Sequence, residues 1–529
     1  MKMKVLVADP IAPRGIEELK KCEEFDVIVQ TGLSEEAVVE LAPELSAIVV
    51  RSQTKITSKI FDAAPNLRVV GRAGVGVDNV DVASATAHGV IVMNTPGGNT
   101  ISTAEHAFSL MMSLARNIPQ ADASVKASRW DRKKYQGVEL YGKTLGILGM
   151  GRIGSEIARR ALAFGMKVCA YDPYLSETKA KTLQVELVEN LDDLLPLCDF
   201  ITLHMPLTSE TKHMLDARRL ALCKKGVRIV NCARGGLVEE GALAEALASG
   251  GVAGAALDVF ELEPPSADLP ILQQEKAIFT PHLGASTTEA QENVGIEISE
   301  AIRAVLLFGE VRNAVNVPSI DAKTLETLGP WIDFCQRLGS FLGQLSPKRV
   351  EKLRVRFSGK IGDRDLTPLT RSVLTGFLRH IGGQEINQVN APARAKALGI
   401  SIIESRHSEP GEFSEWIEVV AESNDASASV RGTFFGRTPR VVIVNERFVE
   451  AEPEGVVLIV ENTDAPGIVG QVGTALAEDK VNIASMSLSR NEIGGTALTV
   501  LNLDSRPSEA MLTKLVKTKS ILSAKVIEV

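Results

Sequence analysis

The sequence has few aromatic residues, no excess of basic charge and no long apolar run. Aromatic side chains make up 4% of the 529 residues, too few to predict the base-stacking surfaces of nucleic-acid-binding proteins. No apolar run reaches the roughly 18 residues that a membrane-spanning helix needs. The 58 basic and 66 acidic side chains give a net charge of −8. This mild acidity argues against nucleic acid or a membrane surface as a partner.

The cysteines are also few and scattered: there are six, and none belongs to a CxxC pair. Their spacing predicts reduced thiols rather than a disulfide framework or a zinc site, and no other metal site is indicated. The first residues, Met1 to Asp9, are expected to enter a strand and not a cleavable signal. The predicted compartment is therefore the cytoplasm.

What the sequence does contain is a repeated alternation of short β-branched runs and helix-like stretches. It extends through residues 1–98 and resumes between residues 144 and 280. Such alternation predicts an α/β protein with two doubly wound parallel sheets. A capped stretch with one apolar face, Ser102 to Arg116, predicts a helix that connects them.

The helical stretch after Leu283 ends near residue 308 and is too short for a domain of its own. We expect it to return to the first sheet. The first domain is therefore predicted to be discontinuous, with residues 1–98 and 285–316, and the second to span residues 99–284.

Two further domains are predicted beyond residue 316. Pro330 is expected to open an amphipathic helix in an α+β domain at residues 317–453, which ends in an acidic linker from Glu450 to Gly455. Residues 454–529 predict a βαββαβ series with the ferredoxin-like order. One of its strands alternates serine with Ala484, Met486 and Leu488, which predicts a buried apolar face.

A dinucleotide site is indicated where a predicted strand runs into Gly149-Met150-Gly151-Arg152-Ile153-Gly154 and a helix follows. Gly149 permits a tight turn, Gly151 lets the backbone approach a pyrophosphate, and Gly154 allows close packing of helix on strand. The next strand ends at Asp172, about 20 residues further on, where a carboxylate can accept hydrogen bonds from a ribose. Because that carboxylate repels a 2′-phosphate, NAD is favoured over NADP. The second domain is thus predicted to be a Rossmann domain.

Catalytic candidates follow three strands of this second sheet: Arg234, Glu263 and His282. Ligands of such folds lie beyond the carboxyl ends of the strands. Oxidation of a secondary alcohol needs a base, a cation for a substrate carboxylate and a group that orients the base, roles that fit His282, Arg234 and Glu263 respectively. Each residue taken singly has a simpler structural interpretation. Asp258 is a loop acid or a nicotinamide contact, and the other six histidines, His106 among them, are interpreted as structural.

These stretches resemble the D-isomer-specific 2-hydroxyacid dehydrogenase family. The similar segments are GMGRIG with Asp172, NCARGG, DVFELEPP, TPHLGAST and, in the first domain, RAGVGVDN. The resemblance implies that Arg234, Glu263 and His282 are catalytic and that the backbone of Val75 and Gly76, with Arg234, holds the substrate carboxylate. It further implies a cofactor site lined by Arg152, Ile153, Asp172, Ala233, Asp258 and His282. Some relatives carry threonine where this chain has Val75 and Met205.

A substrate phosphate would need fixed cations, and Arg51 and Arg72 follow neighbouring strands of the first domain. By resemblance, Arg132 in a basic loop approaches the partner subunit's cleft in a homodimer or homotetramer. Lys133 and Lys134 in the same loop could equally be solvated charges.

The remaining residues resemble a branch of this family, the long-form D-3-phosphoglycerate dehydrogenases. Residues 317–453 are similar to their intervening domain, and residues 455–529 look like an ACT domain. The resemblance implies NAD-dependent oxidation of 3-phosphoglycerate to 3-phosphooxypyruvate, the first step of phosphorylated serine synthesis. It also implies a side activity on 2-hydroxyglutarate and 2-oxoglutarate.

Regulation and rival functions stay open on the sequence alone. L-serine is a candidate effector between paired ACT domains, held by Asn462, Asp464 and Asn482, although Asp464-Ala465-Pro466-Gly467 is also ordinary turn chemistry. Arg440 and Arg447 are weaker candidates for an anion site. The alternatives are another hydroxyacid dehydrogenase, of the glyoxylate, hydroxypyruvate or erythronate-phosphate type, and a non-enzymatic NAD-sensing scaffold.

Overall fold

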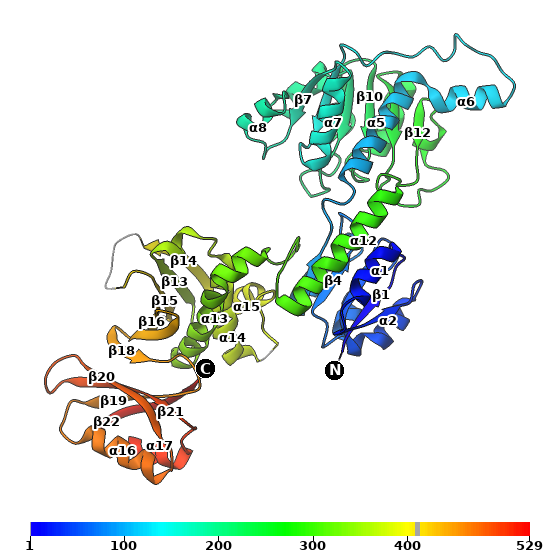
Figure 1. Cartoon of the computed structure of the whole chain (residues 1–529). Helices are drawn as coiled ribbons and strands as arrows, with labels where there is room; N and C mark the ends of the chain where they lie inside the picture. The colour runs from blue at the N-terminus through cyan, green and yellow to red at the C-terminus, as the bar shows by residue number, and fades with distance from the viewer. Residues whose placement is uncertain (1, 384, 408–412) are drawn as a thin grey trace.

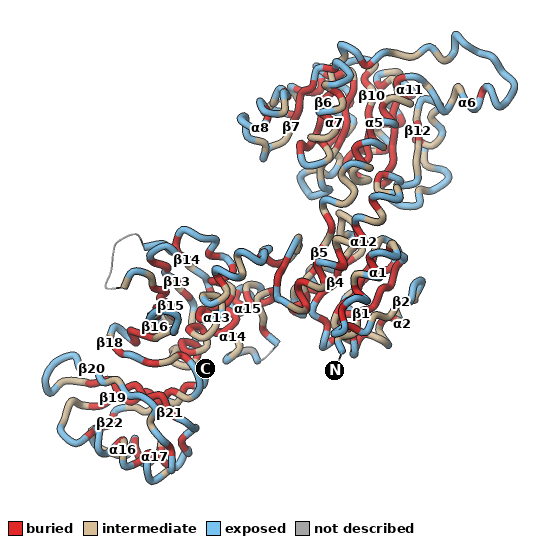
Figure 2. The backbone as a smooth tube through the Cα atoms, viewed as in Figure 1, coloured by how far each residue is buried: buried red, intermediate tan, exposed pale blue. Residues whose placement is uncertain are grey.

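A computed structural model describes residues 2–383, 385–407 and 413–529. Four sheets organise these residues: two parallel sheets form the upper and lower right of Figure 1, and two further sheets lie at the lower left. Buried residues concentrate along the central strands of each sheet (Figure 2). Within the described residues, no helix is both long and apolar enough to cross a membrane.

The first sheet is parallel and has the order β2-β1-β3-β4-β5. Its strands are β1 (Met3–Val7), β2 (Phe25–Val29), β3 (Leu45–Val50), β4 (Val69–Arg72) and β5 (Ile91–Met93). Helices α1 (Pro13–Lys20), α2 (Glu35–Leu41), α3 (Ser58–Asp62) and α4 (Val82–Ala87) connect them. Val5, Leu6 and Val7 are all fully buried, as expected for a strand covered on both faces.

Helix α12 (Thr288–Arg303) packs against α1 and β4 and continues into the π-helical turn η4 (Ala304–Phe308). The approach to α1 is close, because a Cβ on Gly15 would lie 2.6 Å from the carbonyl oxygen of Gly295. The chain after residue 287 thus lies on the first sheet. The exact boundaries of the discontinuous first domain, at residues 98 and 285, stay a prediction.

The second sheet is also parallel, in the order β12-β11-β10-β9-β6-β7-β8. Its strands are β6 (Thr144–Leu148), β7 (Lys167–Tyr171), β8 (Glu186–Leu187), β9 (Phe200–Leu203), β10 (Val227–Asn231), β11 (Val252–Leu257) and β12 (Ala277–Phe279). The helices are α5 (Thr100–Arg116), α6 (Ile118–Lys126), α7 (Arg152–Ala163), α8 (Glu177–Thr182), α9 (Leu191–Leu194), α10 (Ala217–Leu222) and α11 (Glu240–Ser249). Strand β8 was not expected, since two residues are too few to give a pattern.

The third sheet is mixed, in the order β14-β13-β15-β16-β17-β18. It comprises β13 (Lys352–Ser358), β14 (Ser401–His407), β15 (Trp416–Glu422), β16 (Ser427–Phe435), β17 (Thr438–Val444) and β18 (Arg447–Ala451), with α13 (Ala322–Leu345), α14 (Thr367–Gly382) and α15 (Ala391–Ala397). The prediction that Pro330 opens a helix is wrong. Asp321 is the N-cap of α13, and its side chain accepts a hydrogen bond from the Thr324 amide. The helix therefore begins before Pro330, which lies inside it. The predicted linker from Glu450 begins inside β18.

The fourth sheet has the predicted ferredoxin-like order, β20-β21-β19-β22. It comprises β19 (Val456–Thr463), β20 (Ile483–Arg490), β21 (Thr496–Leu503) and β22 (Ile521–Glu528), with α16 (Ile468–Glu478) and α17 (Glu509–Val516). The predicted buried face of β20 is wrong: Met486 and Leu488 are each 43% exposed. Strand β20 is an edge strand, and the core between the sheet and the two helices is built from β19, β21 and β22.

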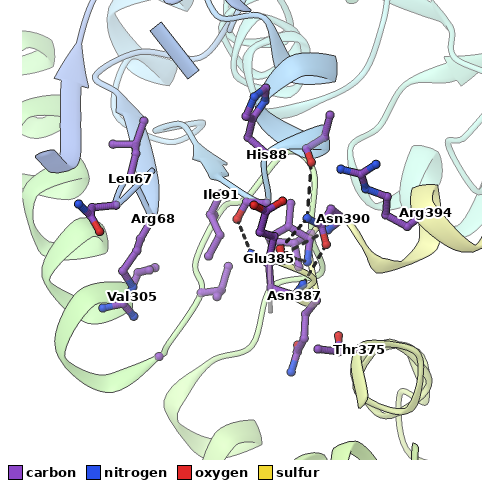
Figure 3. Close-up of a pocket in the computed structure, with 18 of the residues that line it drawn as sticks. Leu67, Arg68, His88, Ile91, Val305, Thr375, Glu385, Asn387, Asn390 and Arg394 are labelled. Carbon is purple, nitrogen blue, oxygen red and sulfur yellow. Dashed lines mark hydrogen bonds between the residues drawn. The ribbon is translucent and has the colours of Figure 1, made fainter. Parts of the chain in front are cut away.

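The junction between the first and third sheets is built by the loop before α15 (Figure 3). Asn387 Nδ2 donates to the carbonyl of Gly89 at 2.8 Å, and Val389 is buried in the core cluster of the first sheet. A cavity of about 830 Å³ lies beside this contact and reaches Arg68, Arg379 and Arg394.

Candidate active site

The loop between β6 and α7 has the shape that a dinucleotide pyrophosphate requires. Gly149 has a φ of 97°, and a Cβ on Gly154 would lie 2.1 Å from the Gly149 carbonyl oxygen. A Cβ on Gly151 would meet no atom within 4 Å, so space is open in front of the helix N-terminus. Arg152 and Ile153 form the first turn of α7. These residues fit the pyrophosphate of NAD.

Asp172 lies directly after β7, beside this loop. Its Oδ2 accepts a hydrogen bond from the Met150 amide at 2.7 Å, and its Oδ1 accepts one from the Tyr174 amide at 2.9 Å. Two backbone donors therefore fix the carboxylate where a ribose would lie. Ala233, which follows β10, donates its amide to Asn231 Oδ1 at 3.1 Å, so a polar strand end shapes the neighbouring turn.

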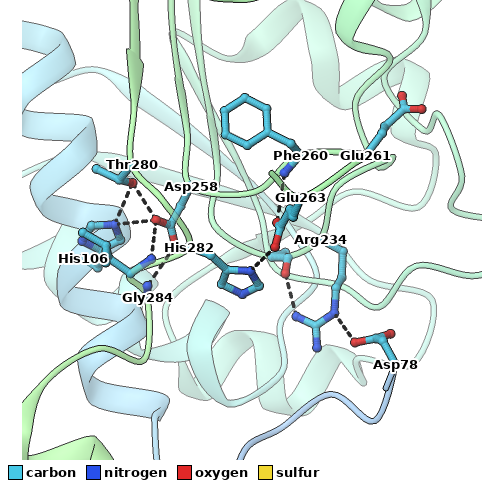
Figure 4. Close-up of polar contacts among 12 residues, drawn as sticks. Asp78, His106, Arg234, Asp258, Phe260, Glu261, Glu263, Thr280, His282 and Gly284 are labelled. Carbon is cyan, nitrogen blue, oxygen red and sulfur yellow. Dashed lines mark hydrogen bonds and ion pairs between the residues drawn. The ribbon is translucent and has the colours of Figure 1, made fainter. Parts of the chain in front are cut away.

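His282 and Glu263 form a hydrogen-bonded pair at the ends of β11 and β12 (Figure 4). His282 Nδ1 lies 2.7 Å from Glu263 Oε2, while Glu263 Oε1 accepts the Phe260 amide at 3.1 Å. The hydrogen bond that His282 donates to Glu263 raises the pKa of His282, although burial opposes this shift. Burial alone would raise the pKa of Glu263. The hydrogen bond with His282 and the charge of that residue act in the opposite direction, and the pKa of Glu263 is lowered. The pair is suited to move a proton through the free Nε2 of the imidazole.

Three arginines of the two parallel-sheet domains form a cluster, and one of them, Arg234, faces His282. A Cβ on Gly76 would lie 2.2 Å from Arg234 Nη2, so the Arg234 guanidinium lies against the loop after β4. Burial, with repulsion from Arg234, lowers the pKa of Arg72 to about 10. Burial also lowers the pKa of Arg51, whose Nη1 donates to Gln291 at 2.6 Å. Crowded, partly buried cations of this kind form a site for an anion.

Two residues that sequence reasoning missed contact these arginines. Asn79 accepts from Arg72 Nε at 3.2 Å and donates to the carbonyl of Arg51 at 2.9 Å, so it joins the two arginines. Asp78 Oδ2 lies 3.5 Å from Arg234 Nε and is the only carboxylate paired with Arg234 among the described residues. Both residues lie in the RAGVGVDN segment. The family resemblance of that segment had indicated only Val75 and Gly76 as site residues.

Asp258 lies beneath the loop that carries His282 and is 1% exposed. Its Oδ1 accepts from Thr280 Oγ1 at 2.6 Å, from the Leu283 amide at 2.7 Å and from His106 Nε2 at 3.1 Å. Its Oδ2 accepts from the Gly284 amide at 2.8 Å. The predicted nicotinamide contact of Asp258 therefore stays a prediction. His106, interpreted from the sequence as structural, belongs to this network.

Three family models match the chain: "D-isomer specific 2-hydroxyacid dehydrogenase, NAD binding domain" over residues 108–284, "D-3-phosphoglycerate dehydrogenase intervening domain" over 327–445 and "ACT domain" over 456–519. The D-3-phosphoglycerate dehydrogenase of Archaeoglobus fulgidus is 43% identical over 99% of this chain and 100% of its own length. That of Bacillus subtilis is 42% identical over 99% of each chain. The chain belongs to the D-3-phosphoglycerate dehydrogenase family.

Solved structures extend this family assignment to the fold of the two parallel-sheet domains. The TT0316 protein of Thermus thermophilus is 33% identical, with a TM-score of 0.55 over 59% of this chain and 100% of its own. A D-lactate dehydrogenase of Aquifex aeolicus, solved with NAD and lactic acid, is 29% identical, with a TM-score of 0.52 over 60% of this chain and 100% of its own. The predicted family, the α/β fold class and NAD as cofactor of a dehydrogenase are thereby confirmed.

Not all predicted site residues gather at the cleft in one chain. Arg132 lies on the exposed segment that follows α6. In the ACT domain, Asn462 is 1% exposed, whereas Asn482 Nδ2 donates to Asp504 at 2.8 Å. Asp464 accepts from Arg490 at 3.2 Å.

The register places the predicted serine contacts at opposite ends of the ACT sheet. Val456 begins β19 and pairs with Leu503, which also pairs with Ile483, the residue after Asn482. Asn462, near the other end of β19, pairs with Ala497. A single chain therefore does not bring Asn462 and Asn482 together. The weaker anion candidates have internal partners, since Arg440 pairs with Glu452 at 2.9 Å and Arg447 donates to the Thr496 carbonyl at 2.6 Å.

Proposed function

We propose that this protein oxidises 3-phospho-D-glycerate to 3-phosphooxypyruvate with NAD, as the first step of phosphorylated serine synthesis in the cytoplasm. The observation that carries the proposal is the cluster of Arg51, Arg72 and Arg234, in which Arg72 lies near the other two arginines and Arg234 faces His282. The substrate bears a carboxylate and a phosphate, and these two anions would offset the mutual repulsion of the arginines. A hydroxy acid without a phosphate carries only its carboxylate and would leave Arg51 and Arg72 without a counter-charge from the substrate.

In the proposed reaction His282 acts as the base. Nδ1–H donates a hydrogen bond to the Glu263 carboxylate, so the neutral ring has a lone pair at Nε2 that can take the proton of the C2 hydroxyl. Arg234 holds the carboxylate and stabilises negative charge on the C2 oxygen as the proton leaves. NAD, held by the Gly149–Gly154 loop and Asp172, would supply the acceptor for the hydride of C2. In the reverse direction His282 returns its proton to the carbonyl oxygen.

The first domain would fix the two ends of the substrate. Backbone groups of Val75 and Gly76 are placed beside Arg234 by the loop after β4, and Asn94 holds the Val75 carbonyl. We assign these groups to the carboxylate, and Arg51 with Arg72 to the phosphate. 2-Hydroxyglutarate, which carries a second carboxylate instead of the phosphate, is the proposed side substrate.

A homodimer or homotetramer would complete two sites. Arg132 would reach the partner subunit's cleft from its exposed segment. Antiparallel pairing of two β20 edges would bring Asn462 and Asp464 of one chain near the partner's Asn482, and we propose that L-serine binds there. Exposed Met486 and Leu488 on β20 support this pairing.

The experiment compares NADH formation from 3-phosphoglycerate, glycerate and D-lactate at alkaline pH, with the keto product trapped. We expect turnover to be selective for the phosphorylated acid and to lose that selectivity in Arg72→Met. Equal kcat/KM for glycerate and 3-phosphoglycerate in the unaltered protein would overturn the proposal. The same assay with L-serine tests the ACT assignment separately.

A further inference from the structure

We propose that His106 is a positioning residue for proton transfer, acting on His282 through Asp258. The proposal rests on the proposed function in that it takes His282 as the base. His106 lies on α5, which neither belongs to the dinucleotide loop nor carries any of the arginines. Its Nε2 lies 3.1 Å from Asp258 Oδ1 and 3.2 Å from Thr280 Oγ1 (Figure 4).

The backbone of His282 is held in an unusual conformation. Its φ of 53° lies in the left-handed region, which is unfavourable for a residue other than glycine. The His282 amide donates to the carbonyl oxygens of Asp258, at 2.9 Å, and Thr280, at 3.0 Å. These contacts hold the imidazole where its Nδ1 can reach Glu263.

The carboxylate of Asp258 binds the backbone of the residues that follow His282. It accepts the amides of Leu283 and Gly284, at 2.7 and 2.8 Å. Main chain and side chain of Asp258 therefore fix the loop on both sides of the imidazole. A carboxylate that is 1% exposed is stable only when donors surround it.

His106 supplies one of the hydrogen-bond donors to the Asp258 carboxylate. His106 and Thr280 are the side chains that donate to Asp258, and Thr280 is itself bound to His106. Burial would raise the pKa of Asp258, but these hydrogen bonds outweigh it and the pKa is lowered. Removal of the imidazole would leave Asp258 Oδ1 short of one donor, so the carboxylate would shift toward others and disturb the loop.

Helix α5 makes two further hydrogen bonds to the segment that follows His282. Thr103 Oγ1 donates to the Gly284 carbonyl at 3.1 Å, and the hydroxyls of Ser102 and Thr287 lie 2.7 Å apart. Helix α5 starts directly after the chain leaves the first sheet. The loop that carries the base is thus attached to helix α5 by several side chains, and His106 is the one that reaches Asp258.

His106→Leu tests the proposal, with His106→Gln as the conservative variant because its amide nitrogen can replace Nε2 as a donor. We expect kcat to fall about 10- to 100-fold in the leucine variant, with the KM values of NAD and the hydroxy acid within about twofold of the unaltered enzyme. Hydride transfer should become rate-limiting, so the isotope effect with substrate deuterated at C2 should rise. Glutamine should restore most of kcat.

The pH profile gives the second measurement. Groups facing the His282 ring are Glu263, Asp258 and Arg234. If the loop shifts, His282 loses part of the Glu263 hydrogen bond, its pKa falls, and the acid limb of kcat/KM moves to lower pH in the leucine variant. His213, which pairs with Glu261 at 3.0 Å, is the matched control; His213→Leu should leave both profile and isotope effect unchanged.

The proposal is overturned if His106→Leu lowers kcat without moving the acid limb or the isotope effect, since that result indicates general destabilisation. Failure of glutamine to restore kcat, with the variant folded by circular dichroism, also overturns it. Failure of the proposed function is seen separately, as no turnover of 3-phosphoglycerate by the unaltered enzyme. The comparison of variants can then use any 2-hydroxy acid that the enzyme does oxidise.

Discussion

His282 Nδ1 and Glu263 Oε2 lie 2.7 Å apart, and the two residues come from loops that follow different strands of one sheet. This contact fixes which imidazole nitrogen is free and sets the direction of the pKa shift of His282. Glu263 is itself held by the Phe260 amide at 3.1 Å. The pair is therefore oriented before any substrate binds.

Glu263→Gln should lower kcat/KM for oxidation by about 100-fold or more. The neutral amide cannot stabilise the imidazolium, so the pKa of His282 falls from its raised value. Oxidation needs neutral imidazole, and activity appears as pH rises through this pKa. The acid limb should therefore move to lower pH while the plateau drops, as measured by kcat/KM over a wide pH range.

Glu261→Gln is the matched control for that experiment. Glu261 lies two residues away and contacts His213 instead of His282. Its replacement should leave the acid limb in place. A Glu263→Gln profile that coincides with that of the unaltered enzyme would rule out Glu263 as the partner that sets the pKa of His282.

Arg72→Met should abolish stabilisation of the protein by inorganic phosphate. Burial and Arg234 lower the pKa of Arg72 to about 10, so a bound anion relieves an unfavourable charge. Phosphate near 100 times its Kd should raise the Tm of the unaltered protein by about 5 °C. Arg218→Met is the control, because Arg218 lies in the second domain and is paired with Asp192 at 2.7 Å. An equal shift in Arg72→Met would assign the phosphate elsewhere.

Local patterns predicted most of the fold and pointed to the candidate catalytic residues, because each pattern depends on neighbours in sequence. The glycine loop with Asp172 and the polar residues after β10, β11 and β12 are of this kind. His106 could not be found in this way. Its partners Asp258 and Thr280 are 152 and 174 residues away, and a histidine on a helix carries no local mark of such a contact.

Two errors have a physical cause in the tertiary structure. Proline usually marks a helix start, yet Pro330 lies within α13 because the Asp321 cap and buried Leu328 fix an earlier beginning. Alternation on β20 correctly indicates two faces but says nothing of what covers them. In one chain the face with Met486 stays exposed.

Asp172→Ser should weaken the preference for NAD over NADP. The Asp172 carboxylate is fixed by the amides of Met150 and Tyr174 and would repel a 2′-phosphate. We expect kcat/KM with NAD to fall about 10-fold and that with NADP to rise. Asp192→Ser, which removes a carboxylate paired with Arg218 and Arg219, should change neither. An unchanged NAD to NADP ratio in Asp172→Ser would contradict the assignment.

Met486→Glu should prevent the proposed pairing of ACT domains through β20. Met486 is 43% exposed on one edge strand, and a charge there would be buried without a partner if two edges met. Sedimentation velocity should show a smaller assembly, and inhibition by L-serine should disappear while turnover without serine remains. Leu522→Glu provides the control, because Leu522 is 53% exposed on β22, the opposite edge of the same sheet. If Leu522→Glu breaks the assembly and Met486→Glu does not, the pairing edge is β22, and Asn482 cannot share a site with the partner subunit's Asp464.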